Sequence, residues 1–429
     1  MSTTGKPIPQ ARSPHLKGTL LLILALLAVF LMLEGDGHRT LFQAGNGLAA
    51  SSGSFGSFVQ PVLNPAQVDE LHHLGKHISY KELASLYVSR MTLDEELGQL
   101  FMVQNRYPYY GADIEQTLEQ FHIGGVILYQ WQMLTLNQAR HDIAQMQKHA
   151  TFPLLISTDE EGGTVDRLSN IYPYHPGATE IAQTGNVQLA AREGARTAHD
   201  LLSLGINVDI APVVDVAVVN GPDQVSRTFG STPQQVTTFA GAYLQAMQQA
   251  GEIACPKHYP GLGAAQVDAH FSLPVINSSR QEINARDLAP YRAFIQSNDL
   301  SLHPGMIMTT DLLMPSIDPV MPAELSYPLI TQVLRQQLGY DGVVVTDSLY
   351  MAGIYPQWDF PQAVVLAIKA GDDMILGASG VKEMTANFAA LKKALRNGTL
   401  TRQRIDESVT RILALKMQYH IMPAVPPKA

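Results

Sequence analysis

Few residues of this chain are cysteine or carry a charge. Its 429 residues include one cysteine, Cys255, which excludes an intramolecular disulfide and a metal site built from several thiolates. Charged residues make up 16% of the chain, and acidic residues outnumber basic ones by 38 to 29, which argues against a nucleic-acid partner. Hydrophobic residues make up 46%, enough for a large buried core, so disorder over most of the chain is excluded.

One stretch near the N-terminus is uncharged and apolar on every face. Residues 18–33 (GTLLLILALLAVFLML) follow the basic residues Arg12 and Lys17 and precede Glu34. As a helix this stretch would reach about 24 Å, somewhat less than the roughly 30 Å hydrocarbon core of a bilayer. We predict an uncleaved signal anchor that holds the chain in the cell membrane as a single-pass protein, with residues 1–17 cytoplasmic and the rest exported.

Two other interpretations of this stretch stay open. It could be a removed signal peptide, which would make the protein secreted, or a buried core helix. A small-residue cleavage site does not follow closely after Leu33, and the nearest candidate lies around residues 48–50. The anchor is therefore favoured over both.

The rest of the chain divides into three predicted parts. Residues 34–79 contain a segment rich in glycine and serine (GNGLAASSGSFGSF) and are predicted to form a flexible linker. Residues 80–420 are predicted to form one catalytic domain, and residues 421–429 a proline-rich tail. A second globular domain is not indicated.

Short apolar runs alternate with longer segments of helical periodicity from about residue 80 onward. This alternation is typical of repeated βα units and a parallel sheet. Eight such runs predict an α/β fold, a closed (β/α)₈ barrel of the TIM type with insertions. The final segment places Ile405, Val409, Ile412 and Leu413 on one helical face, which would close the barrel. The runs are residues 98–103, 124–129, 153–158, 206–214, 252–257, 305–310, 342–347 and 373–377.

Polar side chains follow several of the predicted strands, at the rim where barrels of this type build their sites. Asp159 follows the third run, and Arg227 lies in the loop after the fourth. Lys257 and His258 come at the end of the fifth run, and Asp347 ends the seventh. Carboxylates, a histidine and two cations are therefore expected to meet on one rim.

Each of these residues also has a purely structural interpretation. Asp159 could cap the turn that follows it, Lys257 and His258 could form a structural hydrogen-bonding pair, and Arg227 could hold two loops together as an ion-pair partner. Asp347 could cap a helix. A carboxylate at the end of a buried run of valines needs a stronger reason than capping, so Asp347 is the best functional candidate among them.

Asp268 and His270 lie two residues apart in the loop after the fifth run. In an extended loop their side chains point the same way, so the carboxylate could accept a hydrogen bond from one imidazole nitrogen while the other faces a ligand. That arrangement suits proton transfer near neutral pH. The two could also be unrelated loop residues, since the spacing alone is weak support.

A metal site is the weaker alternative for these side chains. His258, His270, Asp159 and Asp347 are all possible ligands, but none shows a tight ligand spacing such as His-x-x-x-His. We therefore expect no catalytic metal.

Seven motifs, in order, resemble the N-terminal barrel of glycoside hydrolase family 3, in particular its β-N-acetylglucosaminidases. The resemblance covers roughly residues 85 to 417, and seven motifs in sequence are far more specific than any one of them. The motifs are TDEEGGTVDRL, LGINVDIAPVVDV, SRTFG, KHYPGLGAAQVDAHFSLP, SIDPVMPAELS, LGYDGVVVTDSLYMAGI and RIDESVTRILALK.

The resemblance implies roles for three of the candidate residues in the chemistry. Asp347 matches the family's nucleophilic aspartate, which forms a covalent glycosyl-enzyme. Asp268 and His270 match a dyad on a mobile loop, in which the histidine acts first as general acid and then as base. The family's β-glucosidases usually draw this group from a second domain, so a dyad on the barrel's own loop favours the N-acetylglucosaminidases.

The remaining candidates match positions that bind the sugar. Asp159, Arg227, Lys257 and His258 match residues that hold the hydroxyl groups and the N-acetyl substituent, and Arg167 matches a neighbouring arginine of the first motif. The resemblance thus implies a retaining exo-β-N-acetylhexosaminidase that needs neither a metal nor an organic cofactor. Its partner would be a carbohydrate, GlcNAc-containing glycans such as peptidoglycan fragments, and the sequence does not indicate an oligomeric state.

Three residues depart from the family's pattern. Leu262 replaces a histidine in the PGLG turn, Thr164 replaces an arginine after EGG, and Asp311 replaces a histidine after MTT. These departures leave two alternatives open: a glycan-binding barrel without catalytic activity, and a family 3 glycosidase or phosphorylase that prefers another sugar.

Overall fold

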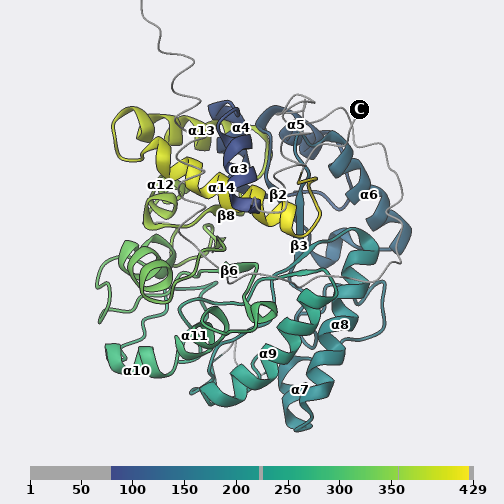
Figure 1. Ribbon diagram of the computed structural model, residues 1–429, viewed down its shortest axis with the longest axis vertical. Helices are drawn as coiled ribbons and strands as arrows, with labels where there is room; N and C mark the ends of the chain where they lie inside the picture. Colours follow the sequence, from purple (N-terminus) through teal and green to yellow (C-terminus); the bar gives the residue numbers. More distant parts are fainter. Residues whose placement is uncertain (1–78, 222–225, 356, 425–429) are drawn as a thin grey trace, which may run out of the picture. The chain divides into compact units, whose positions relative to one another are not determined.

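Eight parallel strands alternate with helices in the computed structural model, which describes residues 79–221, 226–355 and 357–424 (Figure 1). All of these residues belong to one compact unit, residues 55–429. The strand order is β5-β4-β3-β2-β1-β8-β7-β6. The strands are β1 (Phe101–Gln104), β2 (Gly125–Ile127), β3 (Leu155–Thr158), β4 (Val208–Asp209), β5 (Ile253–Ala254), β6 (Met306–Met308), β7 (Val343–Ser348) and β8 (Met374–Leu376).

Helices follow the strands and surround the sheet (Figure 1). The α-helices are α3 (Tyr80–Val88), α4 (Leu93–Gln99), α5 (Ala112–Phe121), α6 (Leu136–His149), α7 (Ala178–Gln183), α8 (Val187–Leu204), α9 (Pro233–Gln249), α10 (Arg280–Ala285), α11 (Ala289–Ile295), α12 (Phe360–Ala370), α13 (Gly380–Arg396) and α14 (Arg402–Gln418). Shorter helical segments are η1 (Gln130–Gln132), η2 (Leu300–Leu302), η3 (Ala323–Leu325) and the π-helix η4 (Pro328–Gln337).

Backbone hydrogen bonds join the two ends of the sheet beside β5 and β6. The Met308 N–H donates to the Pro256 carbonyl over 3.1 Å, and the Tyr259 N–H donates to the Met308 carbonyl over 2.8 Å. The sheet is therefore a nearly closed barrel, and the predicted TIM-type α/β barrel is confirmed. All eight predicted runs overlap a strand, but several strands are shorter than their runs. Pro212 and Pro256 lie just beyond β4 and β5, and proline has no N–H to extend a ladder.

The last helix occupies the position expected from its apolar face. Ile405, Val409, Ile412 and Leu413 of α14 are all fully buried. Helix α14 packs against α3, which joins the two ends of the described chain on one side of the barrel. The predicted closing helix is thus confirmed.

The predicted N-terminal parts lie outside the described residues. This applies to the anchor at residues 18–33, to the linker except Ser79, and to residues 425–429 of the tail. Within residues 79–221, 226–355 and 357–424, no helix is long and apolar enough to cross a bilayer.

A buried carboxylate organises the amino-terminal edge of the barrel. Asp373, directly before β8, is fully buried and forms ion pairs with Arg335 of η4 and with Arg404 and Arg411 of α14. The Ser408 hydroxyl also donates to it, over 2.7 Å. Although burial opposes the shift, the three guanidinium groups lower the pKa of Asp373 to about 2. One aspartate thus fastens η4 and α14 to the strands.

We predict that Asp373→Asn lowers the free energy of unfolding by about 3–5 kcal/mol, because it leaves the largely buried Arg335 and Arg404 without their counter-charge, whereas Arg411 keeps Asp341. The loss should be largest at neutral pH. It should shrink as the pH falls from about 4 towards 2, because the ionised carboxylate stabilises only above its unfolded pKa of about 3.9. Chemical denaturation at several pH values measures this difference.

The matched control is Asp406→Asn, which removes an exposed ion pair with Arg402. Exposed pairs contribute at most about 1 kcal/mol, so this variant should unfold nearly as the unmodified protein does. Equal effects of the two substitutions would contradict the assigned role of Asp373.

Candidate active site

The predicted site residues lie on loops at the carboxyl ends of neighbouring strands. Asp159 follows β3, Arg227 lies between β4 and α9, and Lys257 and His258 follow β5. Asp347 is the last residue but one of β7. Because parallel strands of one barrel end on the same rim, these side chains share one face of the fold.

A buried ion network connects three of these loops. The Lys257 ammonium, 2% exposed, lies 2.7 Å from an oxygen of Asp159 and 2.7 Å from an oxygen of Glu161. Glu161 also accepts two hydrogen bonds from the Arg227 guanidinium, over 2.7 and 2.8 Å. Burial opposes ionisation, but Lys257 and Arg227 hold the pKa of Glu161 well below its usual range. Glu161 and Lys257 are therefore both charged at neutral pH.

Arg167 lies at the edge of this network. Its guanidinium is 4.0 Å from the second oxygen of Asp159 and 5.9 Å from the centre of the Tyr129 ring. Tyr129 in turn stacks on Trp131, with the ring centres 6.4 Å apart. A pocket of about 350 Å³ opens beside them, lined by Tyr129, Gln130, Trp131, Arg167 and Asn170. It offers an aromatic wall and a cation next to Asp159.

His258 is fixed from behind by Asp215, which follows β4. The His258 Nδ1 atom lies 2.7 Å from one Asp215 oxygen, and the other oxygen accepts the Leu262 N–H over 2.7 Å. With Nδ1 donating to the carboxylate, Nε2 carries the lone pair, and the Arg227 guanidinium lies 3.4 Å from it. Asp215 thus sets the ring orientation of His258.

The carboxylate of Asp347, near the end of β7, accepts two hydrogen bonds. One oxygen accepts the Ser348 N–H over 2.7 Å, and the other accepts the Thr310 hydroxyl over 3.4 Å. Burial and then the charges of Asp159 and Asp347 raise the pKa of Tyr129. The charges of both carboxylates therefore reach the same hydroxyl group.

Asp268 and His270 form the pair that their spacing predicts. The His270 Nδ1 atom lies 2.8 Å from an oxygen of Asp268, and the His270 backbone N–H donates to the same oxygen over 2.8 Å. Burial opposes the shift, but these hydrogen bonds lower the pKa of Asp268, with a further contribution from the charge of Arg227. The imidazole is 63% exposed, so the pair is formed while the ring stands in solvent.

Two further carboxyl groups are buried near Asp347. Asp311 is fully buried and accepts the Gly353 N–H over 3.0 Å. Burial and the charge of Asp347 raise the pKa of Asp311 to about 8. Burial, Asp311 and Asp347 also raise the pKa of Glu324, whose two oxygens have no hydrogen-bond partner among the residues described. Asp311 is therefore mostly protonated at neutral pH, and burial favours the protonated form of Glu324 as well.

The structural interpretations weighed from the sequence hold in part. Arg227 does join two loops as an ion-pair partner of Glu161. Lys257 and His258 do not pair with each other, because Lys257 turns to Asp159 and Glu161 whereas His258 turns to Asp215. Two of the three departures from the family's motifs are also accommodated locally. Leu262 is buried, and the Thr164 hydroxyl lies 2.8 Å from the Ser226 hydroxyl.

Sequence reasoning missed four contributors to the site. The motifs contain Glu161 and Asp215. Their position in the sequence does not reveal which side chains they contact in the fold, for example that Glu161 bridges two cations from other loops. Tyr129 ends an apolar run and was counted only as part of a strand. Glu324 also lies inside a motif, SIDPVMPAELS, but its proximity to Asp347 depends on how η3 packs.

The model of the glycosyl hydrolase family 3 N terminal domain matches residues 92–415. The chain belongs to glycosyl hydrolase family 3. The resemblance seen in the motifs is thereby confirmed, and the barrel described above is the family's N-terminal domain.

Family 3 relatives match most of this chain. It is 32% identical over 378 residues to "Beta-hexosaminidase A" of Pseudoalteromonas piscicida, covering 76% of this chain and 61% of the relative. It is 34% identical over 333 residues to "Beta-hexosaminidase LpqI" of Mycobacterium tuberculosis, covering 75% and 82%. A solved family 3 β-N-acetylglucosaminidase from Paenibacillus superposes with a TM-score of 0.72 at 33% identity, covering 77% of this chain and 63% of the other. The chain therefore spans less than two thirds of the first relative.

We predict that Asp311→Asn makes this family 3 barrel more stable at pH 8 than the unmodified protein. Between pH 4 and 8 the folded state keeps a proton on Asp311 that the unfolded chain releases, so stability falls with rising pH by at most about 1.4 kcal/mol per unit. Asparagine removes this contribution while its side-chain oxygen can still accept the Gly353 N–H.

Thermal unfolding of both proteins at pH 4.5, 6, 7 and 8.5 tests this prediction. The difference in melting temperature should move in favour of the variant as the pH rises. A difference that is the same at every pH would show that Asp311 is not protonated in the folded state.

Proposed function

We propose that the protein is a retaining exo-β-N-acetylhexosaminidase that removes terminal GlcNAc from glycans such as peptidoglycan fragments. One observation carries the proposal. Asp347 at the end of β7 and the Asp268–His270 pair on the loop after β5 belong to the same rim of the barrel. The names of relatives such as β-hexosaminidase A and LpqI support the same activity.

In the first step, an oxygen of Asp347 attacks the anomeric carbon of the sugar. The glycosidic C–O bond breaks, and the leaving oxygen takes the proton of the His270 imidazolium. In the second step, His270 takes a proton from water, whose oxygen attacks the anomeric carbon and releases Asp347. The sugar keeps its β configuration, because the carbon is inverted twice.

Asp268 makes His270 suited to both steps. It accepts the Nδ1 hydrogen bond, which leaves Nε2 to exchange the proton with the substrate. Its negative charge also stabilises the imidazolium form needed as acid. Since the ring is largely exposed, the loop would move His270 inward when a sugar binds.

The charge pattern near Asp347 favours this chemistry. Positive charge develops at the anomeric carbon in the transition state, and an ionised Asp347 stabilises it. Burial and neighbouring charge raise the pKa of Asp311 and of Glu324, so both favour the neutral form beside Asp347. Asp159 and its partner Lys257 would hydrogen-bond the sugar hydroxyl groups.

The remaining predicted residues would complete the sugar site. Arg227, His258 and Arg167 would contact the hydroxyl groups and the N-acetyl substituent, and the reaction as written uses no metal or organic cofactor.

We further propose that residues 18–33 anchor the barrel outside the cytoplasm. Protease added to intact cells should then remove the barrel, and protection from protease would contradict this location.

We predict that Asp347→Ala reduces the turnover of an aryl β-GlcNAc by at least about 10³-fold, because the glycosyl-enzyme cannot form. Added azide should restore part of the turnover and give the α-glycosyl azide, since it attacks the face that Asp347 occupies. Product analysis by NMR checks the anomer.

The unmodified protein is assayed in parallel on aryl GlcNAc, glucose and xylose, with and without phosphate. Full activity of Asp347→Ala would remove the nucleophile assignment. Binding of GlcNAc saccharides without any turnover would instead favour a non-catalytic barrel, and a rate that depends on phosphate would favour a phosphorylase.

We predict that His270→Gly slows turnover strongly for poor leaving groups and mildly for good ones, because good leaving groups depart without a proton. A series of aryl β-GlcNAc substrates with leaving-group pKa from about 4 to about 10 measures the trend. Equal losses across the series would contradict the acid role. Asp406→Asn, on an exposed helical face, serves as the control for handling and folding.

A further inference from the structure

A second cluster of ionisable side chains lies buried behind the loop after β3. Glu160, Asp166 and His175 each offer one ligand atom, and these atoms all lie within 4.8 Å of one another. Glu160 is fully buried, His175 is 2% exposed and Asp166 is 8% exposed. None of the three belongs to the sugar site or to the proposed reaction.

Two atoms of this cluster lack a hydrogen-bond partner among the residues described: His175 Nδ1 and Asp166 Oδ1. The Nδ1 atom lies 3.8 Å from the nearest Glu160 oxygen, which is too long for a hydrogen bond. Leaving a buried polar atom without a partner costs about 1–3 kcal/mol. Two such atoms in one cluster therefore call for a ligand between them.

The other atoms of the cluster are already held in place. Glu160 accepts the backbone N–H groups of Gly162 and Leu168, over 3.2 and 2.9 Å. His175 Nε2 lies 3.2 Å from an oxygen of Asp200. With Nε2 donating to Asp200, Nδ1 presents a bare lone pair to the cluster, and a carboxylate behind a histidine is the usual support of a metal ligand.

We propose that Glu160, Asp166 and His175 bind a divalent transition-metal ion, with Zn²⁺ the best match to this donor set. One imidazole nitrogen and two carboxylate oxygens are ligands that Zn²⁺ accepts, and water would complete the tetrahedron. The ion would also neutralise the negative charge of the carboxylates in the cluster. Arg196, whose guanidinium lies 3.9 Å from Asp200, compensates that charge only from outside the cluster.

The position of the cluster gives the ion a structural role. Glu160 lies between Asp159 and Glu161, the two carboxylates that contact Lys257. Asp166 directly precedes Arg167 in the same loop. A metal bound here would fix the loop that carries these sugar-site residues, without touching the reacting atoms.

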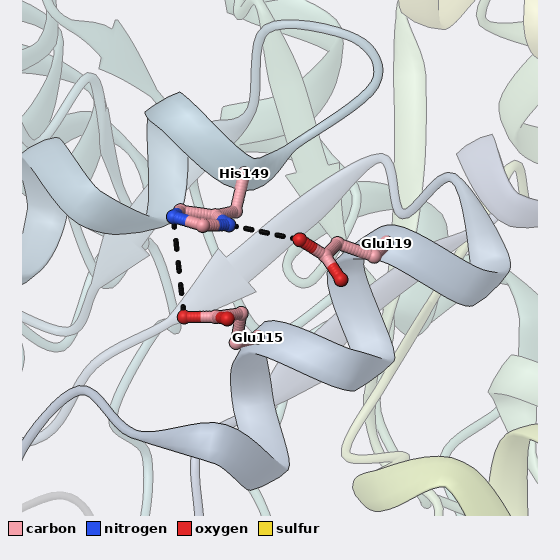
Figure 2. A group of neighbouring side chains, drawn as sticks. All are labelled: Glu115, Glu119 and His149. Atoms are coloured by element: carbon pink, nitrogen blue, oxygen red, sulfur yellow. Dashed lines mark hydrogen bonds and ion pairs between the residues drawn. The ribbon is translucent and has the colours of Figure 1, made fainter.

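A second histidine-carboxylate cluster serves as the contrast (Figure 2). His149 at the end of α6 lies between Glu115 and Glu119 of α5, 3.9 and 2.9 Å from their oxygens. Both imidazole nitrogens face a carboxylate there, and the glutamates are 37% and 53% exposed. The two histidine–glutamate contacts account for this cluster without an ion, so the His149 variant is the matched control.

The experiment uses the full-length protein in detergent, stripped of metal with a chelator and titrated with Zn²⁺, Mn²⁺ and Mg²⁺ by calorimetry. We expect Zn²⁺ to bind most tightly and to raise the melting temperature. His175→Gln and Asp166→Asn should each bind one equivalent less than the unmodified protein, or bind that equivalent at least about tenfold more weakly. His149→Gln should match the unmodified protein.

Cobalt provides a readout that does not depend on activity. Co²⁺ bound by these ligands should give visible absorption bands that Asp166→Asn changes and His149→Gln leaves alone. If His175→Gln fails to fold, Asp166→Asn and the cobalt spectrum still decide. Absence of binding, or a loss caused by His149→Gln and not by Asp166→Asn, would overturn the proposal. Each of these results is independent of whether the barrel hydrolyses GlcNAc.

Discussion

The carboxyl rim of this barrel depends on one buried carboxylate shared by two cations. Glu161 from the loop after β3 contacts Arg227 from the loop after β4 and Lys257 from the loop after β5. Any one of these charges would be unfavourable in the interior without the others. Since each loop supplies one part, none of them can move independently, and Asp159 and Arg167 are positioned as a consequence.

Two other buried acids of this rim lack such partners. On the side of β6 and β7 no cation compensates Asp311 or Glu324 among the contacts described, and burial raises the pKa of both groups. One half of the rim is therefore built from compensated charges, and the other from buried acids that favour the neutral form around Asp347. In the proposed reaction the sugar ring would lie between these two halves.

Local patterns predicted more of the fold than of the site. The eight apolar runs correspond to eight strands, and the apolar face of the last helix is buried as its spacing required. Strand ends were less predictable, because residues such as Pro212 and Pro256 end the ladder before the apolar run ends. The Asp268–His270 pair was predictable because both partners lie in one short segment, whereas Glu324 was not, since its neighbours are distant in sequence.

The sequence by itself determined the alternation of strands and helices, the family, and the residue types at each strand end, because these follow from periodicity and from contiguous motifs. Only the tertiary structure decided which charges compensate one another. In the folded chain, Lys257 contacts Glu161 rather than His258, and His258 contacts Asp215. One atom each of His175 and Asp166 has no hydrogen-bond partner among the described residues. The physical reason is that ionisation depends on burial and on neighbours within a few ångströms, and only the folded chain brings those neighbours together.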